Sequence, residues 1–172
     1  MRKWVVLILV FCVPAVADPV QKEPARTEFE RNLVGRYYVP NVSIYDGCVP
    51  DGWGSPPGQR DLKIDFFSCN GRFLAVLNKR ESRERAVVLD ALLLPLLSDK
   101  NDLKFVGECE DKKKPLMKYP DLFFFVIAHR DKRKESVNWR TGVKAAWWPN
   151  PDTLKFEGYP VRHIVCERPT PP

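Results

Sequence analysis

Cysteines and histidines are the residues of this chain whose chemistry is most specific. Four of the five cysteines follow residue 17, namely Cys48, Cys69, Cys109 and Cys166. Four thiols form two disulfides, or bind zinc when they stand in Cys-x-x-Cys pairs. No two of them have that spacing, so we predict two disulfides and no metal site. Of the three pairings, we expect Cys48–Cys69, which closes a local loop, and Cys109–Cys166, which joins the last strand to a central one.

The two histidines, His129 and His163, stand in no catalytic motif. The sequence lacks a serine nucleophile elbow, a phosphate-binding glycine loop and a His-x-x-x-His pair. We expect His163 to lie on the buried face of a strand, and His129 to end a strand and face water. Because the thiols are expected to be used in disulfides, the sequence predicts a protein that is not an enzyme and needs no cofactor.

Large aromatic side chains offer non-covalent binding instead. Trp147 and Trp148 are adjacent, and neighbouring strand residues point to opposite faces. One ring therefore enters the core, while the other either covers an end of the fold or forms a platform for a ligand. The candidate ligand-binding residues are Trp53, Phe66, Phe73, Phe124, Trp139, Trp147 and Trp148.

Residues 1–17 have the composition of a secretory signal peptide. Arg2 and Lys3 precede a short apolar stretch that ends at Ala15-Val16-Ala17, which is the pattern of such a peptide and its cleavage site. The stretch is shorter than the roughly 20 residues that a membrane span needs. We therefore expect an exported protein, periplasmic in a bacterium and otherwise secreted, with no transmembrane segment in the mature chain.

The charge argues against a nucleic-acid partner. The chain has 28 lysines and arginines against 22 acidic residues. Its basic clusters, at 79–85, 112–114 and 130–134, are interrupted or flanked by Asp or Glu, whereas nucleic-acid-binding proteins gather basic charge on one stripe. We interpret the clusters as solvated turns.

Alternating and continuous apolar segments predict an all-β fold. Residues 18–32 read as a flexible polar tail that allows one helical turn at Glu28–Asn32, 33–168 as one β domain and 169–172 as a flexible proline-rich end. Within the domain, 48–59 is rich in Pro and Gly and predicts a long loop, and Asn70-Gly71 predicts a hairpin turn. The expected strands cover 33–40, 62–66, 73–77, 86–97, 103–109, 122–128, 136–148, 153–158 and 161–168.

These segments predict a small, mostly antiparallel barrel or sandwich of eight or nine strands, stapled by two disulfides. The segment LFFFVIA, at 122–128, is apolar on both faces. Such a strand has to be covered on both sides, so we expect it in the middle of a sheet.

The tripeptide Gly35-Arg36-Tyr37 resembles the Gly-x-Trp signature of lipocalins, with tyrosine at the tryptophan position. The resemblance covers these three residues and the approximate number of strands. It implies that Arg162 or Arg168 packs against the Tyr37 ring, and that a small barrel encloses an apolar ligand.

Taken with the signal peptide, these features predict an exported, non-enzymatic binding protein for a small hydrophobic or anionic ligand. The alternative is a protein-binding module, such as an inhibitor of a secreted enzyme that uses the 49–59 loop, or a structural protein of the envelope. An open pocket of several hundred Å³ favours the first function, and a packed interior favours the second.

Overall fold

The structure is a computed structural model with one α-helix, twelve strands and one 3-10 helix among the residues that it describes. Three strands are only two or three residues long, which explains why alternation predicted eight or nine. The described residues are 26–40, 42, 47–56, 58–98, 101–105, 108–115, 118, 122–129, 136–138 (137 and 138 as backbone alone), 140 and 142–167. The elements are α1 (Glu28–Leu33), β1 (Tyr37–Tyr38), β2 (Cys48–Gly54), β3 (Leu62–Cys69), β4 (Arg72–Arg80), β5 (Ala86–Leu93), β6 (Asn101–Phe105), β7 (Cys109–Asp111), β8 (Phe125–His129), β9 (Ser136–Asn138), β10 (Val143–Asn150), β11 (Lys155–Gly158), η1 (Val161–His163) and β12 (Ile164–Glu167).

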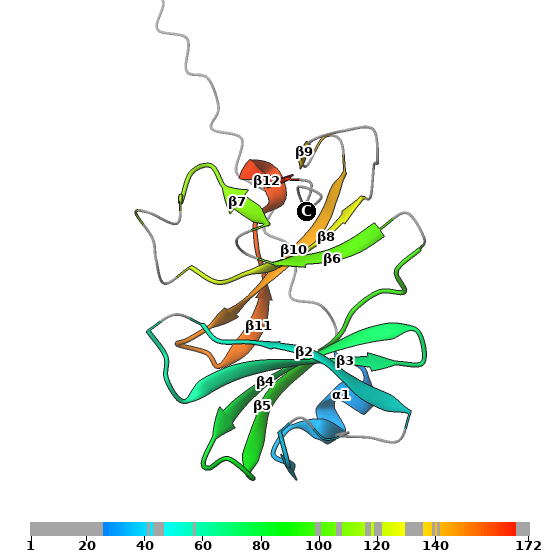
Figure 1. The fold of residues 1–172 in the computed structure, drawn as a ribbon, viewed down its shortest axis with the longest axis vertical. Helices are drawn as coiled ribbons and strands as arrows, with labels where there is room; N and C mark the ends of the chain where they lie inside the picture. Colours follow the sequence, from blue (N-terminus) through cyan, green and yellow to red (C-terminus); the bar gives the residue numbers. More distant parts are fainter. Residues whose placement is uncertain are drawn as a thin grey trace, which may run out of the picture.

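The strands form three sheets, stacked in Figure 1 from bottom to top. Sheet A has the order β1-β5-β4-β3-β2, sheet B the order β11-β10-β8-β6, and sheet C the order β7-β12-β9. All pairings are antiparallel among the described strands. The predicted antiparallel β fold is confirmed. Its form is a curled sheet A with two further sheets above it, rather than one closed barrel.

The β3–β4 hairpin turns at Asn70-Gly71, as the sequence predicted. Asn70 has φ 50° and Gly71 has φ 77°, the left-handed conformation that a tight two-residue hairpin turn needs at both positions. The ladder pairs the two strands from Leu62–Lys79 to Cys69–Arg72. This hairpin forms the centre of sheet A.

The LFFFVIA segment is covered on both faces, as expected, and β8 lies between β10 and β6 in sheet B. Phe125 and Ile127 contact the inner core, between sheets A and B. Phe124 and Val126 contact the outer core, between sheets B and C. The alternation along one strand therefore joins two hydrophobic layers.

Residues 26–32 were expected in a flexible tail with room for one helical turn, but 28–32 belong to helix α1, which packs on sheet A. The Thr27 hydroxyl accepts a hydrogen bond from the Glu30 N–H, and the Glu30 carboxylate accepts one from the Thr27 N–H, which together form a capping box. Leu33 is fully buried against the outer face of sheet A. A polar segment with one buried leucine gives no helical period to detect.

A buried ion pair, Arg26–Asp90, fastens this N-terminal segment to two sheets. The guanidinium of Arg26 lies 2.6 Å from the Asp90 carboxylate on β5. It also donates to the Phe156 carbonyl on β11 at 2.9 Å, and the Phe156 N–H donates to Asp90 at 2.7 Å. The Asp90 carboxylate thus holds the N-terminal segment, sheet A and sheet B together.

Both predicted disulfides, Cys48–Cys69 and Cys109–Cys166, are confirmed. Each joins two residues that face each other across an antiparallel ladder. The first ties β2 to β3 in sheet A. The second ties β7 to β12 in sheet C, where the last strand is the central one and β7 is at the edge.

Three other expectations are corrected. Cys48–Gly54 is the edge strand β2 rather than a loop, since an edge strand tolerates Pro50 and the ladder is irregular between Pro50 and Gly52. The expected strands 103–109 and 136–148 are each divided between two sheets, B and C.

No described helix is long and apolar enough to cross a membrane.

The environment of Tyr37 differs from the one that the lipocalin resemblance implied. The guanidinium carbon of Arg85 lies 3.9 Å from the centre of the Tyr37 ring, at the β4–β5 turn. Arg162 belongs to η1, which leads into sheet C, and Arg168 lies outside the described residues. The cation above Tyr37 comes from a neighbouring turn because β1 pairs with β5.

Candidate functional site

A cleft of about 690 Å³ opens between β2, at the edge of sheet A, and β6, at the edge of sheet B. It reaches the inner core where the two sheets separate. Its volume lies within the roughly 300–1,000 Å³ of small-ligand sites. The lining residues are Asp51, Gly52, Trp53, Phe66, Phe73, Leu97, Ser98, Asn101, Asp102, Leu103, Lys104, Phe105 and Glu108.

Glycine at position 52 keeps the β2 wall of the cleft open. Gly52 faces Phe66 across the ladder, and a Cβ built at Gly52 would meet no atom within 4 Å. At Gly54, two residues along the same face, a Cβ would lie 2.8 Å from the Phe123 ring. The space beside β2 is therefore filled by the Phe123 ring at Gly54, whereas the space that a side chain at Gly52 would occupy is empty.

The floor of the cleft is aromatic. The Phe66 and Phe105 rings meet edge to face, with their centres 4.9 Å apart, and Phe66 also meets Phe125 at 5.4 Å. Phe73, Leu103 and Phe105 are half-buried and pack against the inner core. Apolar side chains that remain partly exposed at a concave surface favour burial by an apolar ligand.

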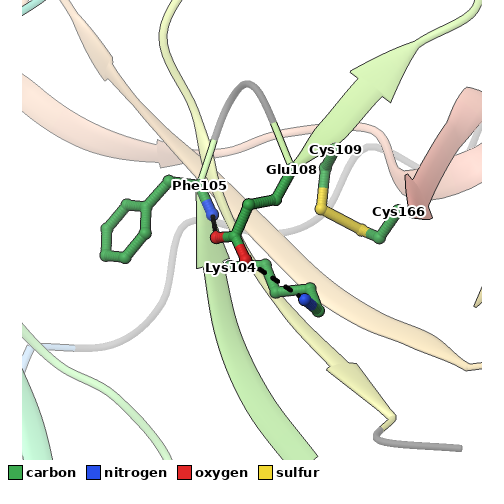
Figure 2. Close-up of a disulfide and its surroundings, with 5 residues drawn as sticks. All are labelled: Lys104, Phe105, Glu108, Cys109 and Cys166. Atoms are coloured by element: carbon green, nitrogen blue, oxygen red, sulfur yellow. Dashed lines mark hydrogen bonds and ion pairs between the residues drawn. A yellow bond between two sulfur atoms is a disulfide. The ribbon is translucent and has the colours of Figure 1, made fainter. Parts of the chain in front are cut away.

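A carboxylate closes the β6 end of the cleft. Glu108 accepts a hydrogen bond from the Phe105 N–H at 3.1 Å, and its other oxygen lies 3.2 Å from the Lys104 ammonium. Figure 2 shows the Glu108 carboxylate between these two groups, with the Phe105 ring and the Lys104 side chain on opposite sides of the strand. The Cys109–Cys166 disulfide follows directly and fixes the segment that carries Glu108.

Three of the seven predicted ligand-binding residues, Trp53, Phe66 and Phe73, line this cleft. Trp53 is 68% exposed. It pairs with Asp65, whose side chain lies beneath the outer face of sheet A. By the alternation of strand side chains, the Trp53 ring belongs to that face and the residue borders the cleft from its edge.

The other predicted residues do not line the cleft. Phe124 stacks on Tyr159 in the outer core, with ring centres 5.1 Å apart. Trp147 is buried in the inner core, and Trp148 packs on the opposite side, which confirms that the two rings take opposite faces. Trp148 also borders a smaller cavity of about 100 Å³ beside Phe123. Trp139 lies outside the described residues.

Sequence reasoning missed Gly52, Leu97, Leu103 and Phe105. The alternation of Leu103 and Phe105 with charged neighbours was visible, but it did not show that β6 ends its sheet. The empty face at Gly52 had no signal, because a glycine among prolines is read as a turn.

The histidines and acidic residues of the described part of the chain do not gather into a candidate metal site. No group of three or more His, Cys, Asp or Glu side chains among the described residues has an arrangement that could hold a metal ion. His163 belongs to η1 rather than to a strand and is half-buried, and its Nε2 has no hydrogen-bond partner among the described residues. His129 ends β8, as predicted, but is half-buried. Neither histidine lines the cleft.

Two buried tyrosines have strongly shifted acidities. Burial, and then the neighbouring Asp65, raise the pKa of Tyr38, whose hydroxyl donates to that carboxylate. Burial, followed by the hydrogen bond to Asp111, raises the pKa of Tyr159 in the same way. Both phenols are therefore held in the protonated form by the fold.

We predict a loss of stability above pH 10 for this reason. An unfolded tyrosine ionises near pH 10, while the folded protein keeps both protons. The stabilisation is fully present below pH 10. Above it, the free energy of unfolding should fall by about 1.4 kcal/mol per pH unit for each such tyrosine. Urea unfolding from pH 8 to 11.5 measures this slope. Tyr159→Phe should reduce the slope, and an unchanged slope would contradict the assignment.

Comparison with known protein families, with characterised proteins and with solved structures finds no match to this chain. The cleft offers an open apolar floor and a polar border.

Proposed function

We propose that this chain is a non-enzymatic binding protein that takes an apolar group into the cleft between β2 and β6. The observation that carries the proposal is the open aromatic floor of Phe66, Phe73 and Phe105 opposite the empty face of Gly52. A cleft of about 690 Å³ holds a small organic molecule or a few side chains. Because the border is acidic rather than basic, it favours an apolar ligand over the anionic one also expected from the sequence.

We also propose that the protein works outside the cytoplasm. Both disulfides are compatible with an oxidising compartment. The apolar segment before residue 18, which lies outside the described residues, supports export as a signal peptide.

Binding of N-phenyl-1-naphthylamine tests the proposed function. This neutral probe becomes fluorescent in an apolar site, so the oxidised chain should raise its emission in a saturable way. Gly52→Phe should weaken the probe's affinity at least tenfold, because the new ring occupies the cleft. The backbone at Gly52 is not left-handed and its Cβ direction is open, so we expect the variant to fold.

Val49→Phe is the matched control, since Val49 is an exposed residue of the same strand that does not line the cleft. We expect its probe affinity to stay within twofold of that of the unchanged protein. Equal binding by Gly52→Phe and the unchanged protein would refute the cleft as the binding site.

A further inference from the structure

We propose that the ligand of this cleft is a short extended peptide segment, which pairs with β6 at Leu103 and carries an apolar residue followed by a basic one. The inference rests on the proposed function and names its ligand class. Three observations carry it: the direction of the β6 backbone, the face on which Leu103 lies, and the charge of the lining side chains.

The outer edge of β6 is capped at both ends and open in the middle. The Asn101 N–H donates to the Ser98 carbonyl at 2.9 Å. The Phe105 N–H and carbonyl are both bound by Glu108, at 3.1 Å each. In an antiparallel ladder alternate residues direct their backbone groups the same way. The N–H and carbonyl of Leu103 therefore point outward too, and no described residue pairs with them.

These two groups call for a peptide rather than a hydrocarbon. One residue of an extended peptide supplies a carbonyl for the Leu103 N–H and an N–H for the Leu103 carbonyl, as in strand addition. A residue directly opposite Leu103 places its side chain on the same face as the Leu103 side chain. That face packs on the inner core beside Phe105, so the peptide side chain enters the cleft.

The charge of the lining selects a basic neighbour. Three carboxylates, on Asp51, Asp102 and Glu108, border the cleft against the one ammonium of Lys104, although the whole chain has a formal charge of +6. In antiparallel pairing, the peptide residue after the one opposite Leu103 lies opposite Asp102. A lysine or arginine there has its side chain on the face of the Asp102 and Lys104 side chains, away from the apolar face of the cleft, where the carboxylates of Asp102 and Glu108 outnumber the one ammonium of Lys104.

Calorimetric titration of the oxidised full chain with capped pentapeptides tests the inference. The probes are TTFKT, TTLKT and TTWKT, whose threonines favour an extended backbone. Each has two matched controls, one with the central nitrogen methylated and one with glutamate in place of lysine. We expect N-methylation to weaken binding at least tenfold, because it removes the donor to the Leu103 carbonyl, and the glutamate change to weaken it at least threefold.

Two protein variants test the same contact from the other side. Leu103→Pro removes the outward N–H, which the ladder does not use, whereas Leu103→Ala keeps it. Peptide affinity should fall at least fivefold more in Leu103→Pro than in Leu103→Ala, with circular dichroism as the measure of folding.

The outcomes separate this inference from the proposed function. If no peptide binds better than its N-methylated control while the naphthylamine probe still binds, the peptide inference fails and the apolar site stands. If neither the peptides nor the probe bind, both fail. Equal binding of the lysine and glutamate peptides would refute the charge preference.

Discussion

Replacing Asp90 with alanine should lower the free energy of unfolding by about 3–5 kcal/mol, the cost of removing one member of a buried ion pair. The side chains of Asp90 and Arg26 are only 8% and 14% exposed. Without the carboxylate, the Arg26 guanidinium keeps only the Phe156 carbonyl among its described acceptors, and the Phe156 N–H loses its acceptor. Urea denaturation followed by circular dichroism measures the loss.

The exposed ion pair of Arg85 and Glu81 is the matched control. Its side chains are 57% and 42% exposed, so Glu81→Ala should cost no more than about 0.5 kcal/mol. The double variant Arg26→Ala/Asp90→Ala should lose less than the sum of its single variants, because each single variant leaves one buried charge unpaired, whereas the double variant leaves none. Equal costs for Asp90→Ala and Glu81→Ala would contradict the role assigned to Asp90.

Removing the Cys109–Cys166 disulfide should destabilise the protein by about 4 kcal/mol, and removing Cys48–Cys69 by about 3 kcal/mol, in the chain-entropy model. The difference follows from sequence separations of 57 and 21 residues. Domains of this size unfold with about 5–15 kcal/mol, so either loss is a large share of the total. The test is urea unfolding of the two double serine variants.

The Cys109–Cys166 variant should also alter the cleft, since Cys109 directly follows Glu108, which closes the cleft's β6 end. We expect weaker binding of the naphthylamine probe in that variant than in the Cys48–Cys69 variant, measured well below the unfolding midpoint of each. The opposite order would show that Glu108 is held by other contacts.

Local pattern was sufficient to predict the centre of the fold. Alternation identified β3, the Asn70-Gly71 turn fixed its hairpin with β4, and the apolar β8 segment indicated a strand covered on both faces. The sequence allowed three disulfide pairings, and the preferred one, which joined Cys48 to Cys69 across a local loop and Cys109 to Cys166, is the one in the structure. These features depend on neighbours in sequence, which a single chain displays directly.

The cleft could be predicted only in part, because it depends on which strands end the sheets. Phe66 and Phe73 were identified as large apolar residues of neighbouring strands. Phe124 was grouped with them, yet it directly precedes β8 and its ring lies in the outer core, on the opposite face from Phe125. Gly52 contributes to the cleft because it has no side chain, and Leu103 because its backbone N–H and carbonyl point outward. The sequence pattern predicts neither feature.

The two disulfides differ in when they can form as the chain is made from its N-terminus. Cys48 lies at the start of β2 and Cys69 at the end of β3, and these two strands pair with each other. The two cysteines can therefore join once β3 has been synthesised. Cys109 lies on edge strand β7 and has to wait for Cys166 on β12, 57 residues later. During that interval its thiol is exposed to mispairing with the earlier cysteines. Efficient production of the protein should therefore depend on a disulfide isomerase, whereas a chain truncated before β12 would leave Cys109 reduced.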